Sequence, residues 1–464
     1  MVTAHETLLK VSPLDGSVLA EVATPTRDLI TSVVQAAREA QQTWAGIPLP
    51  AKAKMLIAAA EILKARADEF VDAVRQETGK PSRVARGELD ASIDMAYQVA
   101  SYGRYPSGYV APSAIEGRQI LVERVPFGVA LLIVSYNTPL PNYAWKVFPS
   151  LMAGNASILK PSPHTPLSAR MFGEVLREAG IPAEICPIVE GGAAAVESII
   201  SSGVDLVSFT GGGEAGRAIA SHPHLTSTKV ILEMGGANPF FVFPDADLDR
   251  AVDAALESAY SNAGQRCASA SRLIIHQSVS PEFLARFHEK AKKVIWGLGD
   301  DVDVSTLINA VAAANFEEFL ASCVSDGATV TRVGQKSSDP GDSEALVQPA
   351  LIESVPFDAA SATREIFGPA TRVFEFSTPE EAIAIAQASE LGLTAAVWSG
   401  DVAFAQKFAR KVPAGVVNIS GPTHGAEINI PFGGVKNSGN GTRDAGFEAV
   451  LEYSDTRVVS TFSS

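Results

Sequence analysis

Cys267 is the residue whose surroundings best fit covalent chemistry. It lies in residues 264–272, which read GQRCASASR and carry almost no bulk around the thiol. A sulfur flanked by small residues on a loop can be reached by a substrate, and a carboxylate elsewhere in the chain can activate it or a water beside it. Glu233 lies upstream, in residues 232–236 (LEMGG), and is a candidate for that carboxylate. The alternative is that Cys267 is a small buried apolar residue, as most single cysteines are.

The cysteines indicate a reducing compartment. The chain has three, Cys186, Cys267 and Cys323, and their spacing fits neither a disulfide framework nor a zinc site. We therefore expect no metal and a cytoplasmic location. Cys186 lies in an apolar run and is predicted to be a core residue.

Composition excludes several classes of protein. The 464 residues are 46% hydrophobic and 19% charged, which predicts a globular protein of two or three domains. A formal charge of −15 without clustered Lys and Arg disfavours nucleic acid as a partner. No apolar run approaches the ~20 residues needed to cross a bilayer, and residues 1–10 do not resemble a signal peptide. We expect a soluble protein without a membrane partner.

Helical and strand patterns alternate along the chain, which predicts an α/β fold with a mostly parallel sheet. Residues 31–75 are expected to form two helices that end at Gly79-Lys80-Pro81, and residues 120–125 alternate like an exposed strand of a projecting hairpin. Residues 129–134 form a continuous apolar run that ends in SYNTP, typical of a buried parallel strand. Loops at the carboxyl ends of such strands bind ligands.

Two more strand ends carry candidate nucleotide contacts. One apolar run ends at Lys160, and another is followed by Gly211, Gly212 and Gly216 at the start of a helix. Glycines let the backbone approach a phosphate, and a helix amino terminus offers free N–H groups. The spacing is not G-x-G-x-x-G, so an ordinary tight turn is the alternative. Lys160 fits ribose hydroxyls or a phosphate, or else is a solvated surface residue.

Seven motifs follow one another along nearly the whole chain. They are SYNTP at 135–139, GN at 154–155 with LKPS at 159–162, FTG at 209–211, LEMGG at 232–236, GQRC at 264–267, EIFGP at 365–369 and PFGG at 431–434. In this order they resemble the motifs of the aldehyde dehydrogenase superfamily. The resemblance implies that a thiolate at Cys267 attacks an aldehyde, that Asn137 and the Cys267 backbone N–H stabilise the oxyanion, and that Glu233 activates the water that hydrolyses the thioester.

The resemblance also implies a cofactor site for NAD or NADP. Lys160 and Ser162 match adenosine-ribose contacts, and Glu365 matches the residue that holds the nicotinamide ribose, although a helix-start carboxylate is its alternative. The other implied cofactor contacts are Tyr136, Pro163, Gly211, Gly212, Gly216 and Phe367. Many NAD-preferring members have a Glu where this chain has Pro163, which leaves NAD and NADP both open. Gly212 and Gly213 stand where hydroxyl residues are more frequent, so backbone contacts would have to hold the pyrophosphate.

The substrate is indicated by fewer residues. Trp145 resembles an aromatic wall of the substrate tunnel, with Tyr143 and Asn142 as neighbours, or is a core residue. Residues 420–428 correspond to the substrate-anchoring loop, and their GAEI element together with GQRC is similar to the branch that oxidises semialdehydes. Arg266 or His424 could meet a carboxylate on such an aldehyde, or either is a surface or packing residue.

The implied architecture is a Rossmann-like cofactor domain, a catalytic α/β domain and a small β oligomerisation arm. We expect the cofactor domain at 1–107 and 126–234, the catalytic domain at 235–423, the arm at 108–125 and 446–464, and a return to the cofactor domain at 424–445. An exposed edge strand invites pairing, so a homodimer or homotetramer is expected.

Two other classes of protein compete with hydrolytic oxidation. In a coenzyme A acylating dehydrogenase of the same fold, the thioester passes to coenzyme A and no water has to be activated. Such an enzyme does not need a general base, so the presence of Glu233 argues against this class. In a non-enzymatic relative the fold serves a structural role, which would not require Cys267, Glu233 and Asn137 together.

Overall fold

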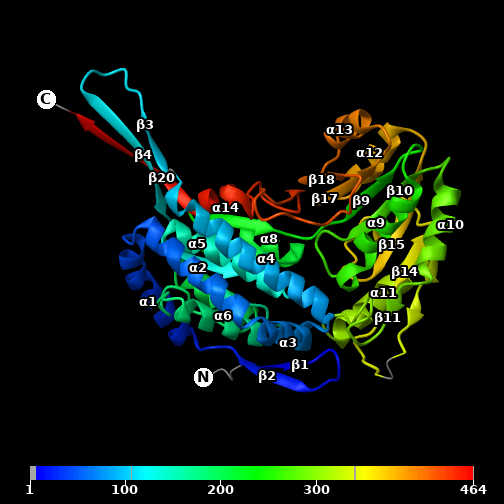
Figure 1. Ribbon diagram of the computed structural model, residues 1–464, viewed down its shortest axis with the longest axis horizontal. Coiled ribbons are helices and arrows are strands. Elements are labelled where there is room, and N and C mark those ends of the chain that lie inside the picture. The colour runs from blue at the N-terminus through cyan, green and yellow to red at the C-terminus, as the bar shows by residue number, and fades with distance from the viewer. Residues whose placement is uncertain (1–6, 106, 339–340, 463–464) are drawn as a thin grey trace.

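The chain folds into two lobes and a projecting arm (Figure 1). The computed structural model describes residues 7–105, 107–338 and 341–462. The expected segments 1–107 and 446–464 therefore extend beyond the described residues at 1–6, 106 and 463–464.

The first lobe is built on a four-stranded parallel sheet in the order β6-β5-β7-β8. Its strands are β5 (Val129–Ile133), β6 (Ala156–Lys160), β7 (Leu206–Thr210) and β8 (Lys229–Glu233). Every residue of β5 and β6 is buried, as continuous apolar runs predict for strands covered on both faces. The predicted α/β class with parallel strands is confirmed.

Eight helices of this lobe surround the sheet. They are α1 (Arg27–Ala45), α2 (Leu49–Ala65), α3 (Ala67–Thr78), α4 (Ser82–Ser101), α5 (Pro139–Ala153), α6 (Pro166–Glu178), α7 (Ala193–Ser201) and α8 (Gly213–Ala220). Residues 31–75 thus belong to three helices, and the expectation of two was wrong. The extra break lies at Arg66, whose φ of −98° and ψ of 22° leave the helix without the Gly or Pro that would mark it in the sequence.

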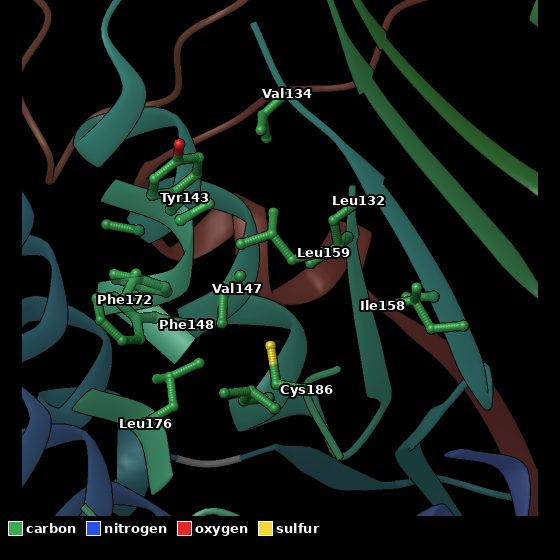
Figure 2. Close-up of a cluster of buried hydrophobic side chains, with 14 of the residues drawn as sticks. Leu132, Val134, Tyr143, Val147, Phe148, Ile158, Leu159, Phe172, Leu176 and Cys186 are labelled. Carbon is green, nitrogen blue, oxygen red and sulfur yellow. The ribbon is translucent and has the colours of Figure 1, made fainter. Parts of the chain in front are cut away.

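Figure 2 shows part of the core of this lobe, where side chains from α5 and α6 pack against β5 and β6. Phe148 and Phe172 are fully buried there, with ring centroids 5.7 Å apart. Cys186 lies in the same cluster, which confirms its prediction as a core residue.

The second lobe is built on a seven-stranded sheet in the order β12-β14-β15-β10-β9-β17-β18. Its strands are β9 (Asn238–Val242), β10 (Ala270–His276), β12 (Thr329–Arg332), β14 (Ala350–Glu353), β15 (Ala370–Phe376), β17 (Thr394–Trp398) and β18 (Val416–Ile419), with only β12 antiparallel to its neighbour. Its helices are α9 (Leu248–Tyr260), α10 (Ser280–Ala291), α11 (Ala310–Ser325), α12 (Pro379–Gln387) and α13 (Val402–Ala409). Met234 belongs to the core of the first lobe and Phe240 to that of the second, so the chain changes lobe between these two residues.

The arm is a three-stranded antiparallel sheet in the order β20-β4-β3 that projects from the first lobe (Figure 1). It consists of β3 (Gly108–Ala111), β4 (Arg118–Pro126) and β20 (Ser454–Phe462), and α14 (Gly446–Glu452) leads into its last strand. The remaining strands form three small pairs: β1 (Thr7–Val11) with β2 (Val18–Ala23), β11 (Ile295–Trp296) with β13 (Gln335–Lys336), and β16 (Leu391–Gly392) with β19 (Val435–Lys436). The predicted projecting hairpin is confirmed. None of the described helices combines the length and apolar character needed to cross a bilayer.

Candidate active site

One cavity of about 670 Å³ contains most of the predicted site residues. Its lining comes from both lobes: α4, α5 and the ends of β5, β7 and β8 on one side, and the loops around Cys267 and residues 423–426 on the other. The predicted site residues in its wall are Tyr136, Asn137, Trp145, Gly211, Gly212, Glu233, Arg266, Cys267, Glu365, Phe367 and His424. Lys160, Ser162, Pro163 and Gly216 do not line it.

Cys267 is presented by a loop with unusual backbone angles. After α9, Asn262, Ala263 and Gly264 all have a left-handed φ, of 54°, 53° and 66°. A Cβ at Gly264 would lie 2.0 Å from the carbonyl oxygen of Gly368, so only glycine fits there. The carbonyl of Cys267 accepts a hydrogen bond of 2.7 Å from Asn238 Nδ2, and its backbone N–H faces only its own sulfur among the described residues. That N–H is therefore available to a ligand.

The Cys267 thiol is held in its protonated form. Burial, together with the carboxylates of Glu365 and Glu233, raises its pKa to about 12, and Arg266 opposes this shift. A thiol with this pKa is almost wholly protonated at neutral pH. Formation of the thiolate therefore requires a proton acceptor in the cavity.

Glu233 ends β8 as a buried carboxylate that faces the backbone N–H of Gly434. Both oxygens are inaccessible to solvent and lack a described hydrogen-bond partner of normal geometry. Burial raises its pKa well above the usual value, and nearby Asp444 adds to the shift while Lys146 and Arg443 oppose it. A Cβ at Gly433 would lie 2.6 Å from Oε1, so a glycine makes room for the carboxylate. A group of this kind can take up and release a proton near working pH.

A buried ion pair next to Glu233 was missed by the sequence analysis. Lys146 Nζ donates to Asp444 Oδ2 at 2.9 Å and to Ser208 Oγ at 2.8 Å. Tyr453 also donates to that hydroxyl. Asp444 lines the cavity with its Oδ1 unpaired among the described residues. The two partners are 298 residues apart in the chain, and no local pattern links them.

Asn137 lies between β5 and α5 with 8% of its surface exposed. Its carbonyl oxygen accepts from Lys80 Nζ at 2.8 Å and from Asn262 Nδ2 at 3.2 Å. Its side-chain Oδ1 is 3.5 Å from Asn142 Nδ2, and none of the described residues accepts a hydrogen bond from its Nδ2. The amide N–H groups are thus available to the cavity.

Three of the predicted cofactor residues, Glu365, Tyr136 and Phe367, line the cavity. Glu365 Oε1 accepts from the backbone N–H of Gly236 at 3.1 Å, and burial raises the pKa of this carboxyl to about 7. The rings of Tyr136 and Phe367 meet edge to face with centroids 6.0 Å apart. These groups offer a carboxylate oxygen beside aromatic surface.

The glycine loop is only partly open to a ligand. The N–H of Gly211 donates to the carbonyl of Glu233 at 3.1 Å, and Gly216 is packed against Met234. Gly212, which precedes α8, has open space where a Cβ would lie. Lys160 is buried, donates to the carbonyls of Pro161 and Gly191 at 2.8 and 2.9 Å, and has a pKa lowered by burial to about 8.

The predicted substrate residues surround the remaining part of the cavity. Trp145 packs edge to face on Phe432 with centroids 5.8 Å apart. The Nε of Arg266 is buried without a described partner. Burial and Arg266 lower the pKa of His424 to about 4, so this ring is neutral.

Tyr143 does not lie in this cavity. It is fully buried, and its hydroxyl group hydrogen-bonds to Thr165, so its placement beside the substrate was wrong. Helix α5 turns this side chain toward the core and Trp145 toward the cavity. The described residues contain no group of three or more His, Cys, Asp or Glu arranged as a metal site.

The family model described as "Aldehyde dehydrogenase family" matches residues 1–459. This chain belongs to the aldehyde dehydrogenase family. It is 34% identical over 452 residues to a succinate-semialdehyde dehydrogenase of Paenarthrobacter nicotinovorans, covering 95% of this chain and 98% of that protein. It is 32% identical to a benzaldehyde dehydrogenase [NAD(+)] of Pseudomonas putida, covering 97% and 92%.

Solved structures of aldehyde dehydrogenases share the fold. Betaine aldehyde dehydrogenase of Staphylococcus aureus in complex with NAD+ matches with a TM-score of 0.93 and 28% identity over 98% of this chain and 91% of that one. 3,6-Anhydro-L-galactose dehydrogenase in complex with NAP gives 0.93 and 29% over 98% and 96%. This aldehyde dehydrogenase is therefore an oxidoreductase that converts an aldehyde to a carboxylic acid with NAD or NADP.

The cavity of this aldehyde dehydrogenase fits a nicotinamide cofactor. Gly212 leaves room for a phosphate at the start of α8, and Glu365 Oε2 has no described partner and can accept from a ribose hydroxyl. Tyr136 and Phe367 supply flat apolar surface beside it.

Proposed function

We propose that the oxidation proceeds through a thioester on Cys267 that is hydrolysed by water activated by Glu233. One observation carries this proposal: Cys267, Asn137 and Glu233, whose carboxylate is buried, line the same cavity. A purely structural protein would have no reason to bury an unsatisfied carboxylate beside a thiol, because such burial is costly.

The first steps are proton removal and attack. The proton of Cys267 passes to a carboxylate of the cavity, for which Glu233 is the candidate. The sulfur then forms a bond to the aldehyde carbon, and the oxyanion accepts from Asn137 Nδ2 and the Cys267 N–H. When bound, the oxidised nicotinamide supplies the acceptor for the hydride that leaves this carbon.

Hydrolysis of the resulting thioester completes the reaction. Glu233 removes a proton from water, the hydroxide attacks the acyl carbon, and the carbon–sulfur bond breaks to release the carboxylic acid and the thiolate. Asp444 and Lys146 form a polar route next to Glu233 by which Glu233 can lose its proton between the two steps.

The cofactor is held by Glu365 at the nicotinamide ribose, by Tyr136 and Phe367 beside it, and by the Gly211–Gly212 turn at the pyrophosphate. Lys160, Ser162 and Pro163 form the adenosine end, and the Lys160 ammonium, which donates to two carbonyls, keeps a third N–H for a ligand. Pro163 offers no carboxylate to repel a 2′-phosphate, so the enzyme accepts both NAD and NADP. The four-stranded lobe is accordingly the cofactor domain and the seven-stranded lobe the catalytic domain.

The substrate is an aldehyde with an apolar stem and an anionic far end. Trp145 and Phe432 provide apolar surface, and the guanidinium of Arg266 has no described carboxylate partner within the protein. Relatives named as succinate-semialdehyde and alpha-ketoglutarate semialdehyde dehydrogenases agree with a semialdehyde.

A panel of aldehydes tests this function, assayed with NAD and with NADP, each with and without coenzyme A. We expect reduced cofactor and free carboxylic acid without coenzyme A, and no turnover by Cys267→Ala. Reduced cofactor that forms only with coenzyme A would show instead that the thioester is passed to that thiol, and turnover by Cys267→Ala would exclude the covalent route.

We also propose a homodimer or homotetramer in the cytoplasm. β20 pairs with β4 on one side only, and Val458 and Phe462 on it are 59% and 64% exposed, so a second copy can extend the sheet. All three cysteines are free, as in a reducing compartment. Light scattering after gel filtration tests the assembly, and a monomer would refute it.

A further inference from the structure

Lys80 and Glu88 form a buried ion pair that the proposed reaction does not use. Lys80 lies at the corner between α3 and α4, where the sequence shows only the helix-ending Gly79-Lys80-Pro81. It is 4% exposed, and its Nζ contacts the carboxylate of Glu88. The same Nζ donates to the carbonyl oxygen of Asn137 at 2.8 Å. One ammonium group thus joins α4 to the backbone of the proposed oxyanion donor.

The carbonyl of Asn137 also accepts a hydrogen bond from the other lobe. Asn262 Nδ2 donates to it at 3.2 Å and to the carbonyl of Gln265 at 3.3 Å. Asn262 begins the left-handed segment that presents Cys267. The backbones that carry Asn137 and Cys267 are therefore tied through a single carbonyl oxygen with two donors.

Further contacts close this arrangement into a ring. Gln265 donates to the carbonyl of Thr306 at 3.3 Å and accepts from the N–H of Ile308 at 3.0 Å. The neighbouring Ser305 donates to the carbonyl of Gly79, which precedes Lys80. The ring thus runs from Lys80 through Asn137, Asn262, Gln265 and residues 305–308 back to the corner.

This ring of hydrogen bonds stabilises two features of the site that are unfavourable by themselves. A left-handed backbone is unfavourable for residues other than glycine, and Asn262 and Ala263 both adopt it. Removing an ion pair from water is also costly. Burial lowers the pKa of Lys80 and raises that of Glu88, and the charge of each partner opposes the shift of the other. The charge of Arg266 lowers both pKa values. Because burying the Lys80–Glu88 pair beside Asn137 costs free energy, we expect the pair to have a function, and its contact with the Asn137 carbonyl indicates that it positions this residue.

We propose that Lys80 is a positioning residue that holds the Asn137 amide at a fixed place relative to Cys267 by fixing the Asn137 carbonyl. Glu88 keeps the ammonium in place. This inference rests on the proposed function, because it needs Asn137 to stabilise the oxyanion.

A double-mutant cycle tests the inference. Lys80→Met should lower kcat by about tenfold to a hundredfold in the otherwise unchanged enzyme, since an error of about 1 Å in a reacting geometry costs on the order of 10² in rate. The KM for the cofactor should change little. In an Asn137→Ala background the same substitution should lower kcat by less than about threefold, because the group that Lys80 positions is already gone.

Lys52→Met is the matched control. Lys52 is equally buried in α2, with its ammonium 5.6 Å from the ring centre of Trp44, and does not line the cavity. It should leave kcat nearly unchanged, and thermal unfolding compares the stability of the two variants. If Lys80→Met does not fold, Asn262→Gly removes the second donor without backbone strain, and its effect should likewise shrink in the Asn137→Ala background.

An equal loss of kcat in both backgrounds, or a loss no larger than that of Lys52→Met, would overturn the positioning role and leave the proposed function intact. Wild-type turnover by Asn137→Ala would instead overturn the oxyanion assignment, and the inference with it.

Discussion

Replacing Gly235 with alanine should displace Glu365 without unfolding the protein. A Cβ at this position would lie 2.1 Å from Glu365 Oε2. Ordinary contact begins at 3.4 Å, so the carboxylate must move by about 1.3 Å. Because the obstructing atoms are at the end of a flexible side chain, the movement costs little beyond the hydrogen bond from Gly236. The variant therefore tests how the position of this carboxylate affects activity while the fold stays intact.

The expected loss follows from what Glu365 is proposed to hold. A hydrogen bond to a charged group contributes about 1.5–3 kcal/mol, which corresponds to about 10-fold to 150-fold in rate or affinity. We expect the rate of the first hydride transfer, followed by absorbance of reduced nicotinamide in stopped flow, to fall within this range. The KM for the aldehyde should change less than twofold to threefold.

Two further glycine variants complete the test. Gly236→Ala puts a Cβ 2.4 Å from the backbone carbonyl oxygen of Cys267, which cannot move freely, so this variant should lose stability as well as activity. Gly46→Ala, at the end of α1, meets nothing closer than 3.5 Å and should behave as wild type. A Gly235→Ala enzyme with wild-type hydride transfer would refute the role of Glu365. A Gly235→Ala enzyme that is as unstable as Gly236→Ala would refute the argument that the Glu365 side chain can move aside at little cost.

Three other predictions concern the same cavity. Glu233→Gln should slow steady turnover, by about 10²–10⁴, more than it slows the first burst of reduced cofactor; a burst and a steady rate that fall by the same factor would contradict its assignment as base for hydrolysis. Alkylation of Cys267 by iodoacetamide in the ligand-free enzyme should rise with pH well above neutrality, because burial and then Glu365 raise the thiol pKa to about 12. Glu365→Gln removes a negative charge that disfavours the thiolate, so the alkylation profile should shift to lower pH, and a shift to higher pH would be inconsistent with this reasoning. Arg266→Met should lower kcat/KM for a carboxylate-bearing aldehyde by about tenfold or more relative to a neutral aldehyde of equal length; an unchanged ratio would exclude Arg266 as the anion contact.

The sequence predicts well those features that local patterns determine. The continuous apolar run before SYNTP predicted β5. The resemblance to aldehyde dehydrogenases implied that Asn137 and Glu233 serve one reaction with Cys267, and all three line one cavity. The break at Arg66 was not predictable in this way, because arginine has no special backbone preference and neither Gly nor Pro marks the helix end there.

Contacts made by long side chains across the fold are what the sequence could not supply. Lys146 and Asp444 read separately as ordinary charged residues, yet they meet beside Glu233 because α5 and the segment before α14 pack against the same sheet. Lys80 was visible only as part of a helix stop. Each of these lysines is buried, and a buried ammonium requires a partner; a periodicity analysis of α5 that places Lys146 among apolar positions would have raised the question of its partner.

The high pKa of Cys267 indicates a second role for the carboxylates of the cavity. Glu233 and Glu365 both raise the thiol pKa, so the groups proposed to hydrolyse the thioester and hold the cofactor also keep the sulfur protonated while the site is empty. A protonated thiol is a poor nucleophile and resists oxidation. When a ribose hydroxyl donates to Glu365, the carboxylate charge is partly compensated, and the amount by which Glu365 raises the thiol pKa decreases. Cofactor binding then prepares the nucleophile before the aldehyde arrives, and alkylation of Cys267 at a fixed pH should be faster with bound oxidised cofactor wherever the sulfur stays accessible.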